Sequence, residues 1–422
     1  MKWPLRKVGE IADLCLGKML DQKKNKGVLR PYLANVNVRW GVFELDDLRG
    51  MRFEDHELNR YGIRNGDIVM CEGGEPGRCA IWHEQLPGMM VQKALHRVRV
   101  RSGIDHRFLY YTFLDYGRTG HFEQYFTGST IKHLPGEKLA MVEVAVPPLT
   151  EQRRIASILS AYDDLIENNT RRIAILEEMA RRIYEEWFVR FRFPGHEHTR
   201  MVESELGLVP EGWVSCAVID VAVVHRGRSY KGSELADLGG RPFVNLKCME
   251  RDGGFRASGL KRYTGQFKET HTVRQGDMVM GITDMTQERR IVARVGRVSR
   301  LDMDFGVFSM DLVRIASRGL YPEAYLYAMF RWSGFGDEVK QHANGANVLH
   351  LLPARIEDFR FACPSPELAA RFGDVIVPML ALCDMLEEKN ANLRTTRDLL
   401  LPRLISGELD VSDVPELQVV AA

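Results

Sequence analysis

The sequence predicts a mixed α/β protein in which two related globular domains are joined to two long helices that form an antiparallel coiled coil. Three observations predict this fold: the chain of 422 residues repeats itself, two stretches carry helical-seam spacing, and short strand patterns alternate with glycine and proline turns. With 45% hydrophobic residues, the chain has enough apolar side chains for two or three domains with their own cores.

One long helix is predicted over residues 147–193. Thr150 supplies a capping hydroxyl just after two prolines, and an acidic and an amide side chain follow in the first turn. Asn169 falls inside the seam of this helix, where a buried asparagine fixes the register; the alternative is that it faces water. Apolar residues recur three and four apart at Ile155, Ile158, Tyr162 and Leu165 and, after a slip of one residue, at Ile166, Ile173, Leu176, Ala180, Ile183 and Trp187.

A second long helix is predicted over residues 364–407. Two such seams in one chain can satisfy each other as an antiparallel pair. Pro378 lies inside the pattern, where a proline kinks a helix or costs about 3 kcal/mol, whereas Pro402 is expected to end or bend it. The second seam consists of Phe372, Val375, Met379, Leu382, Leu386, Leu393, Thr396 and Leu400.

Residues 1–146 and 213–363 read as two copies of one mixed α/β domain. RNGDIVM at 64–70 matches RQGDMVM at 274–280, and Gly128 with His133 matches Gly345 with His350. In the first copy, strands are predicted at 67–70, 94–100 and 142–146 and a helix at 107–116. The stretch 194–212 is a polar linker and 408–422 a tail, so the repeated unit is a globular domain followed by a long helix.

Composition points to a soluble cytoplasmic protein that does not enter a membrane. The net charge is +1, and the N-terminus lacks an apolar signal core. The seven cysteines include no CxxC pair, which argues for a reducing compartment and against a disulfide framework or zinc site.

No catalytic motif is found in the sequence. It contains no GxxxxGK[ST] phosphate loop, no Asp/Asn-Pro-Pro-Tyr/Phe methylase box and no convincing nuclease cluster. His196 and His198 lie in the linker, where solvated surface is the better interpretation than a metal site. We therefore expect a protein that is not an enzyme. The alternatives are an autonomous nuclease or methyltransferase with degenerate motifs, and a coiled-coil scaffold that binds only proteins.

The predicted architecture suits an elongated ligand with two separated features. Two related but non-identical domains held apart by stiff helices would read double-stranded DNA at two places, with a spacing set by protein geometry. Because the two domains have diverged, the target would be asymmetric.

The sequence resembles the specificity subunits of type I restriction–modification enzymes. The resemblance is carried by PPLTEQRRIASILSAYDDLIENN and the following text at 147–188, VPEGW at 209–213, LLLPRLISGELD at 399–410, PYLANVNVRWG at 31–41 and the repeated Gly-Asp strand. It implies two target-recognition domains, each reading half of a split DNA sequence, and helices that act as spacer and dock two methyltransferase subunits. Restriction and translocase subunits would complete the complex. It also implies that S-adenosylmethionine, ATP and Mg bind only to partner subunits and that this chain binds no cofactor or metal.

Candidate DNA-binding residues divide into phosphate contacts, which position, and base contacts, which specify. For each set the alternative is a merely soluble, turn-forming loop. The phosphate candidates are Lys18, Lys23, Lys24 and Lys26 in the first domain and Arg226, Arg228 and Lys231 in the second. The base-reading candidates are Arg30, Tyr32, Asn35, Asn37, Arg39, Arg78, Ser129, Thr130 and Lys132, and Arg241, Asn245, Lys247, Arg251, Thr283, Thr286, Gln287, Arg289, Asn344 and Asn347.

A partner-binding site is predicted at the end of the first long helix. Trp187, Phe188 and Phe191 follow one another closely there. So many aromatic residues exceed what one helical seam needs, which favours a docked protein over an isolated coiled coil.

Overall fold

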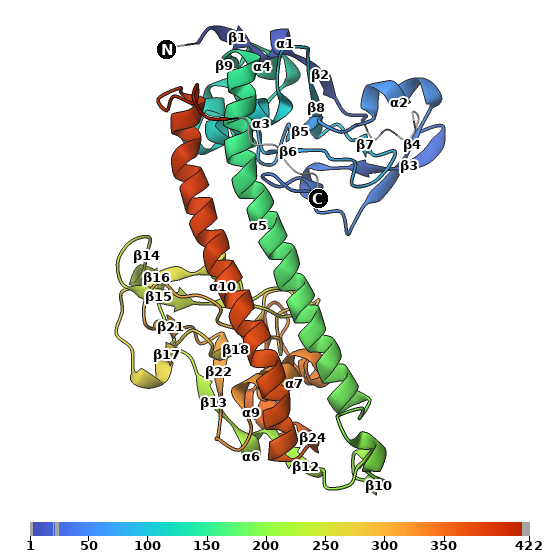
Figure 1. The fold of residues 1–422 in the computed structure, drawn as a ribbon, viewed down its shortest axis with the longest axis vertical. Helices are drawn as coiled ribbons and strands as arrows, with labels where there is room; N and C mark the ends of the chain where they lie inside the picture. The colour runs from blue at the N-terminus through green and yellow to red at the C-terminus, as the bar shows by residue number, and fades with distance from the viewer. Residues whose placement is uncertain (1–2, 20, 22–24, 416–422) are drawn as a thin grey trace. The chain divides into compact units, whose positions relative to one another are not determined.

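The computed structural model describes residues 3–19, 21 and 25–415 and divides the chain into two compact units. Unit 1 comprises Met1–Glu167 with Asn392–Ala422, and unit 2 comprises Asn168–Ala391. Each unit combines one globular part with a stretch of both long helices (Figure 1). The predicted mixed α/β fold with two long helices is confirmed.

The two long helices are α5, Leu149–Tyr184, and α10, Pro366–Ile405 (green and red in Figure 1). The expected interruption of the second helix is not found, because α10 is continuous through Pro378. Pro378 is exposed, so the carbonyl that loses its N–H partner can bind water instead. At its end, α5 widens into a π-helical turn, Glu185–Val189.

Within each unit the helices pair antiparallel. In unit 2, Ile173 lies beside Cys383, and the rings of Tyr184 and Phe372 are 6.0 Å apart. In unit 1, the carboxylate of Asp163 accepts from the guanidinium of Arg397. In unit 2 the contact partner on α10 moves back along the chain as α5 advances, as the sequence predicts.

The buried face of α10 differs from the predicted seam by one residue position over part of its length. Ile376, Leu380 and Cys383 are buried, whereas Val375 is exposed and Met379 and Leu382 are only half-buried. Ile376 and Leu380 belong to the core of unit 2, so that core rather than the helix pair alone decides which face is buried. On α5, likewise, Leu165 is exposed and Ile166 is buried.

Unit 1 is built on an antiparallel four-stranded sheet in the order β2-β8-β5-β6, beside a three-stranded sheet β4-β3-β7 and the pair β1-β9. Helix α3 begins where the Asp105 carboxylate accepts from two backbone N–H groups, and it ends at Gly120 in the left-handed conformation. The strands are β1 Leu5–Lys7, β2 Ala12–Leu16, β3 Val28–Leu33, β4 Arg49–Phe53, β5 Ile68–Cys71, β6 Cys79–Ile81, β7 Met90–Val91, β8 Leu95–Val100 and β9 Glu143–Ala145. The shorter helices are α1 Val8–Ile11, α2 Asp55–Tyr61, α3 His106–Thr119 and α4 Gly136–Met141.

Unit 2 repeats this plan with a four-stranded sheet β13-β22-β18-β20, a five-stranded sheet β14-β16-β15-β21-β17 and the pairs β12-β24, β19-β23 and β10-β11. The last pair is a hairpin inside the predicted linker. The strands are β10 Met201–Ser204, β11 Gly207–Pro210, β12 Val214–Ala217, β13 Ala222–Arg226, β14 Leu235–Ala236, β15 Arg241–Val244, β16 Lys261–Tyr263, β17 Thr272–Val273, β18 Met278–Gly281, β19 Thr283–Asp284, β20 Val295–Arg297, β21 Gly306–Phe308, β22 Leu312–Ser317, β23 Leu349–His350 and β24 Arg360–Cys363. The shorter helices are α6 Val218–Val221, α7 Glu323–Trp332, α8 Phe335–Val339 and α9 Pro353–Glu357.

The strand register shows that the sequence repeat is a structural repeat. Met70 pairs with Cys79 in unit 1, and Met280 pairs with Val295 at the matching place in unit 2. The buried strands β5 and β18 come from the two copies of the Gly-Asp motif, and they lie at the same position in their sheets. The loops attached to this frame are therefore directly comparable between the units.

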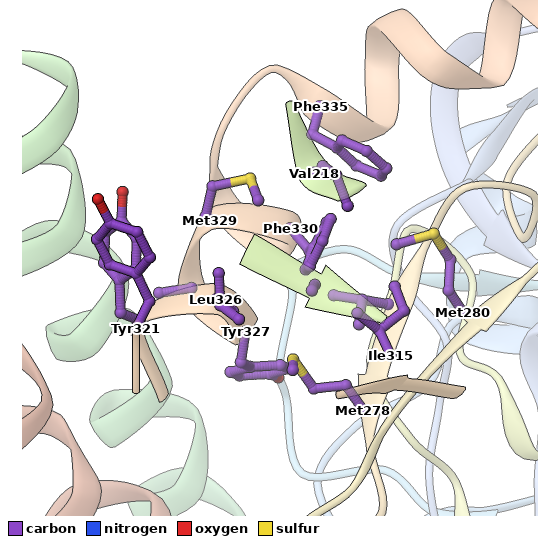
Figure 2. Close-up of a cluster of buried hydrophobic side chains, with 14 of the residues drawn as sticks. Val218, Met278, Met280, Ile315, Tyr321, Leu326, Tyr327, Met329, Phe330 and Phe335 are labelled. Atoms are coloured by element: carbon purple, nitrogen blue, oxygen red, sulfur yellow. The ribbon is translucent and has the colours of Figure 1, made fainter. Parts of the chain in front are cut away.

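The core of each unit joins its sheet and aromatic helix to the long helices. In unit 2, Met278 and Met280 of the sheet meet Leu326 and Phe330 of α7 (Figure 2). Phe372 of α10 belongs to the same core. Because long-helix residues complete the core, each globular part depends on the helices for its stability.

Two asparagines pair inside the helix contact of unit 2. Asn169 is 9% exposed and Asn390 is 3% exposed, and the Asn169 amide donates to Oδ1 of Asn390 at 2.9 Å. The prediction that Asn169 is buried in the seam is confirmed, and its partner is the asparagine that the sequence analysis overlooked. A buried amide pair fits only one register, because any shift leaves both amides unsatisfied.

Asn390→Ala should lower the free energy of unfolding by about 1–3 kcal/mol, because the buried amide of Asn169 loses its acceptor. Urea unfolding measures the change. Asn168→Ala is the matched control, since Asn168 is exposed on the same turn. An equal loss in both variants would contradict the role of the pair.

Charged groups connect α3 to both long helices in unit 1. The Tyr111 hydroxyl donates to the Asp163 carboxylate at 2.7 Å, and Arg397 bridges Asp163 and Asp398. Arg118 of α3 also contacts Asp398 at 2.5 Å. Burial acts to raise the pKa of Asp398, but the hydrogen bonds and charges of Arg118 and Arg397 outweigh it, so the pKa is lowered.

The stability that Asp398 contributes should be present at neutral pH and lost as the pH falls below the ordinary aspartate range, near pH 4. Asp398→Asn should therefore be less stable than the wild type at pH 7 and approach it at pH 3. Urea midpoints at both pH values test this. Glu137→Gln, an exposed change on α4, is the control. Parallel pH profiles for wild type and Asp398→Asn would refute the assignment.

Candidate nucleic-acid interface

A short hairpin occupies the same place in both units. Thr127 and His133 exchange backbone hydrogen bonds of 2.8 and 2.9 Å, and Asn344 and His350 exchange bonds of 3.0 and 2.9 Å. Just inside each closing pair is a glycine with positive φ. A Cβ on Gly128 would lie 2.2 Å from the carbonyl oxygen of residue 131, so this turn requires glycine.

Each hairpin is fixed to the loop that follows the central buried strand. The N–H of Leu134 donates to the Glu72 carbonyl at 2.8 Å, and the N–H of Leu351 donates to the Ile282 carbonyl at 2.8 Å. The structure thus brings together two sets of candidates that are distant in the sequence. In unit 2, the Gln287 amide donates to the carbonyl of Ala346 at the hairpin tip at 3.1 Å.

The hairpin tips differ in chemistry although their frames match. Ser129, Thr130 and Lys132 are exposed in unit 1, and Asn344 and Asn347 are exposed in unit 2. The sequence analysis missed the apolar Ile131, which is exposed at the same tip. Such a side chain between polar ones can contact a thymine methyl group, whereas hydroxyl and amide groups bind base edges.

Five candidates are buried, and the side chains of three of them, Lys18, Asn37 and Asn245, have polar contacts within the fold. Lys18 forms an ion pair with Glu57, and the amide of Asn37 binds backbone groups around residues 34–47. Burial acts to raise the pKa of Glu57, but the Lys18 ammonium and the Glu54 N–H outweigh it and lower the pKa. These five side chains have little freedom to reach DNA: Lys18, Tyr32, Asn37, Asn245 and Thr283.

Other candidates are half-buried and held by neighbouring groups. Arg78 donates to the Glu75 carboxylate at 2.7 Å and to the Asn35 carbonyl at 2.9 Å. Arg241 pairs with Asp304 at 2.6 Å and lies over the Phe305 ring at 3.9 Å. Such contacts orient a guanidinium but must be loosened before it can bind a base. The remaining members of this group are Arg30, Asn35, Arg39, Arg228 and Arg289.

The remaining described candidates are exposed. Thr286 is exposed but its hydroxyl contacts Asp284 at 3.0 Å. Lys23 and Lys24 lie outside the described residues. The exposed group consists of Lys26, Ser129, Thr130 and Lys132 in unit 1 and Arg226, Lys231, Lys247, Arg251, Thr286, Gln287, Asn344 and Asn347 in unit 2.

The aromatic residues predicted to bind a partner are already packed inside unit 2. Phe188 is buried against Phe372 and Tyr325, with ring centroids 5.0 Å apart in both contacts. Trp187 also contacts Phe372, and the Phe191 ring packs edge-on against Trp213 at 5.2 Å. The core of unit 2 therefore buries Phe188 and leaves Trp187 and Phe191 half-buried, and docking of a partner protein at these rings stays a prediction.

Membrane-spanning helices and metal-ligand clusters are both absent from the described part of the chain. None of its helices is both long and apolar enough to cross a bilayer. Among the same residues, no three histidine, cysteine, aspartate or glutamate side chains are grouped as metal ligands.

Comparisons with known proteins place this chain beside one group. Residues 1–178 match the family model of the type I restriction modification DNA specificity domain. The chain is 25% identical over 359 residues to the type I restriction enzyme MjaIX specificity subunit of Methanocaldococcus jannaschii, covering 83% of this chain and 79% of that protein. It is 22% identical over 255 residues to the MjaVIII specificity subunit of the same organism, covering 59% and 55%.

A solved structure shares the fold. The S subunit of a type I restriction-modification system from M. genitalium aligns over 96% of both chains, with a TM-score of 0.56 and 15% identity. The mixed fold of this chain is therefore found in a protein of the same group.

Gly128→Ala should open the unit 1 hairpin, because the added methyl group collides with a backbone oxygen and the left-handed φ of +89° disfavours alanine. Hydrogen exchange of the Thr127 and His133 amides should become faster. Ser129→Ala, an exposed neighbouring change, should leave both rates unaltered. Unchanged exchange in Gly128→Ala would contradict the turn geometry.

Proposed function

We propose that this chain, whose residues 1–178 match the type I restriction modification DNA specificity domain, is a specificity subunit of a type I restriction–modification enzyme and that each of its globular parts reads one half of a split, asymmetric DNA sequence. The observation that carries this proposal is the matched hairpin, which has one frame in both units and a different tip in each. One frame places both tips in the same way relative to their sheets. Different tip chemistry then gives different base preferences and an asymmetric target.

The exposed basic residues supply the positioning part of the interface. Lys26 in unit 1, and Arg226 and Lys231 in unit 2, are exposed near the loops of each globular part. Contacts from such residues to phosphates add affinity without sequence preference and weaken as salt rises. Half-buried arginines such as Arg78 and Arg241 are bonded to a carboxylate or carbonyl of their own unit. The guanidinium group must release that internal partner before it can bind a base edge.

Methylation and restriction are carried out by other subunits of the complex. Residues 1–146 and 213–363 are the two recognition domains, and the long helices set their spacing and dock two methyltransferase subunits. Restriction and translocase subunits join them, and S-adenosylmethionine, ATP and Mg bind on those partners. Of the predicted docking residues, Phe188 is buried whereas Trp187 and Phe191 are half-buried, so the docking surface extends from these two rings along the outward faces of the helices. Leu165, Ile175 and Met179 of α5 are apolar and exposed, and such residues suit a protein contact.

The test is methylation mapping across the genome of cells that express this chain with its cognate methyltransferase subunit. A single split asymmetric motif, lost when the chain is deleted, is the expected result. Methylation without sequence preference, or an unchanged pattern after deletion, would refute the proposal.

Paired variants then test the division of labour between the units. Thr130→Ala should relax the sequence preference in one half of the methylated target only, and Asn347→Ala should relax it in the other half only. Loss of one good base contact removes roughly 1–3 kcal/mol of discrimination, which lowers the preference for the correct base about five- to 150-fold. If either variant relaxed both halves equally, independent reading by the two units would be wrong.

A further inference from the structure

Unit 1 contains an aromatic cleft beside its hairpin. The cleft has a volume of about 530 Å³ and is lined by the rings of Trp40, Tyr116 and Phe126. Glu123 of the 3-10 turn His121–Tyr125 lines it as well, and so do Thr130 and Lys132 of the hairpin tip. Aromatic, acidic, hydroxyl and basic groups therefore meet in one hollow next to candidate DNA contacts.

The Trp40 wall of this cleft is fixed by its neighbours. The indole Nε1 donates to Oε1 of Glu75 at 3.0 Å, and Oε2 of Glu75 accepts from Arg78 at 2.7 Å. The ring lies against α3 at Gly117, where a Cβ would be only 2.3 Å from the indole. The Glu75 carboxylate is thus engaged by two donors, and the indole is held in place as a flat wall.

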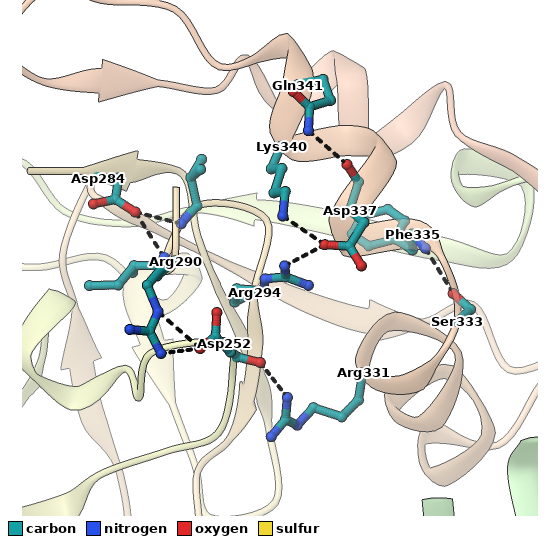
Figure 3. Close-up of polar contacts among 12 residues, drawn as sticks. Asp252, Asp284, Arg290, Arg294, Arg331, Ser333, Phe335, Asp337, Lys340 and Gln341 are labelled. Atoms are coloured by element: carbon teal, nitrogen blue, oxygen red, sulfur yellow. Dashed lines mark hydrogen bonds and ion pairs between the residues drawn. The ribbon is translucent and has the colours of Figure 1, made fainter. Parts of the chain in front are cut away.

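Unit 2 has ion-paired side chains on the corresponding segments. Arg294 precedes β20 as Arg78 precedes β6, and it pairs with Asp337 at 2.6 Å (Figure 3). Lys340 binds the same carboxylate at 2.7 Å, and the carbonyl of Asp252 accepts from Arg331 at 2.6 Å. Figure 3 shows these groups drawn together around the loop that contains Arg290, in contact with Asp252.

The loop lengths explain the difference between the units. In each unit, one loop begins at a backbone bridge to the hairpin and ends just before the next strand of the sheet. This loop comprises residues 73–78 in unit 1 and the longer stretch 283–294 in unit 2. The longer loop reaches the hairpin through Gln287, and the shorter one leaves the hollow between loop, helix end and hairpin. The cleft of unit 1 is therefore bounded by a loop that is longer at the matching place in unit 2.

We infer that this cleft receives one unstacked nucleobase of the bound DNA. The inference rests on the proposed function, because it assumes that unit 1 binds DNA through the adjoining hairpin. Aromatic rings stack on any base, and a carboxylate accepts from the exocyclic amine of cytosine, adenine or guanine but finds no such donor on thymine. Lys132 at the hairpin tip is placed to neutralise the phosphate of the extruded nucleotide.

A base fits these groups better than the arginine or lysine side chain of a protein partner. A cationic side chain would be attracted by the aromatic rings and by the Glu123 carboxylate, but the Lys132 ammonium in the same cleft would repel it. Glu75 offers it little, because Arg78 already neutralises that carboxylate. A nucleotide uses the rings, the carboxylate and the lysine together.

The fluorescent deoxynucleotide of 2-aminopurine tests this on the full chain, since stacking on aromatic rings quenches its emission. We expect saturable quenching, with dAMP, dCMP and dGMP displacing the probe at least fivefold better than dTMP. A duplex with one unpaired adenine should displace it at lower concentration than the same duplex fully paired. Phe126→Ala should weaken probe binding at least fivefold, and Glu123→Ala should remove the discrimination against dTMP.

Gln124→Ala is the matched control, because Gln124 is exposed on the same turn as Glu123 and does not line the cleft. It should bind the probe as the wild type does. Absence of saturable quenching, or displacement by arginine ethyl ester in preference to every nucleotide, would overturn the inference. Binding of a fully paired duplex is measured separately by fluorescence anisotropy, so a failed cleft is distinguished from a failed DNA-binding function.

Discussion

The packing of each sheet against the long helices is the constraint on which the rest of the structure depends. In unit 1, Ile155 and Leu159 of α5 and Leu401 of α10 share one core with the sheet and α3. In unit 2, Tyr184 of α5 and Phe372 of α10 complete the core around α7. The helices are thus parts of both cores, and a change in their pairing alters the burial of the globular parts. The Asn169–Asn390 pair lies where such a change would be most costly, because two amides lose their partners together.

A fixed frame leaves the loops free to diverge. The same strand register and the same glycine-closed hairpin occur in both units, whereas the loop after the central strand differs in length and charge. One unit consequently has an aromatic cleft where the other has a cluster of ion pairs. This arrangement separates the residues that hold each globular part together from the loop residues that differ between the two units.

The charged side chains also explain why composition is a poor guide to the interface. A net charge of +1 hides many arginines, and several of those near the loops, such as Arg39 and Arg241, are paired with carboxylates of their own unit. These pairs hold the guanidinium groups in place in the free protein. Any ligand that binds one of these guanidinium groups must first displace a carboxylate that is already bonded to it.

The sequence by itself determined the duplicated α/β plan, the two long helices and the buried position of Asn169. These features follow from local spacing: a seam repeats every three or four residues, and the two Gly-Asp strands carry nearly the same letters. Only the tertiary structure decided which face of α10 is buried, because the core of unit 2 selects Ile376 over Val375. It also decided which candidate side chains already have a bonding partner within the fold. The carboxylate that pairs with Lys18, for example, comes from Glu57, far along the chain. The aromatic cleft depends on contacts among four separate segments, and no spacing within any one of them predicts it.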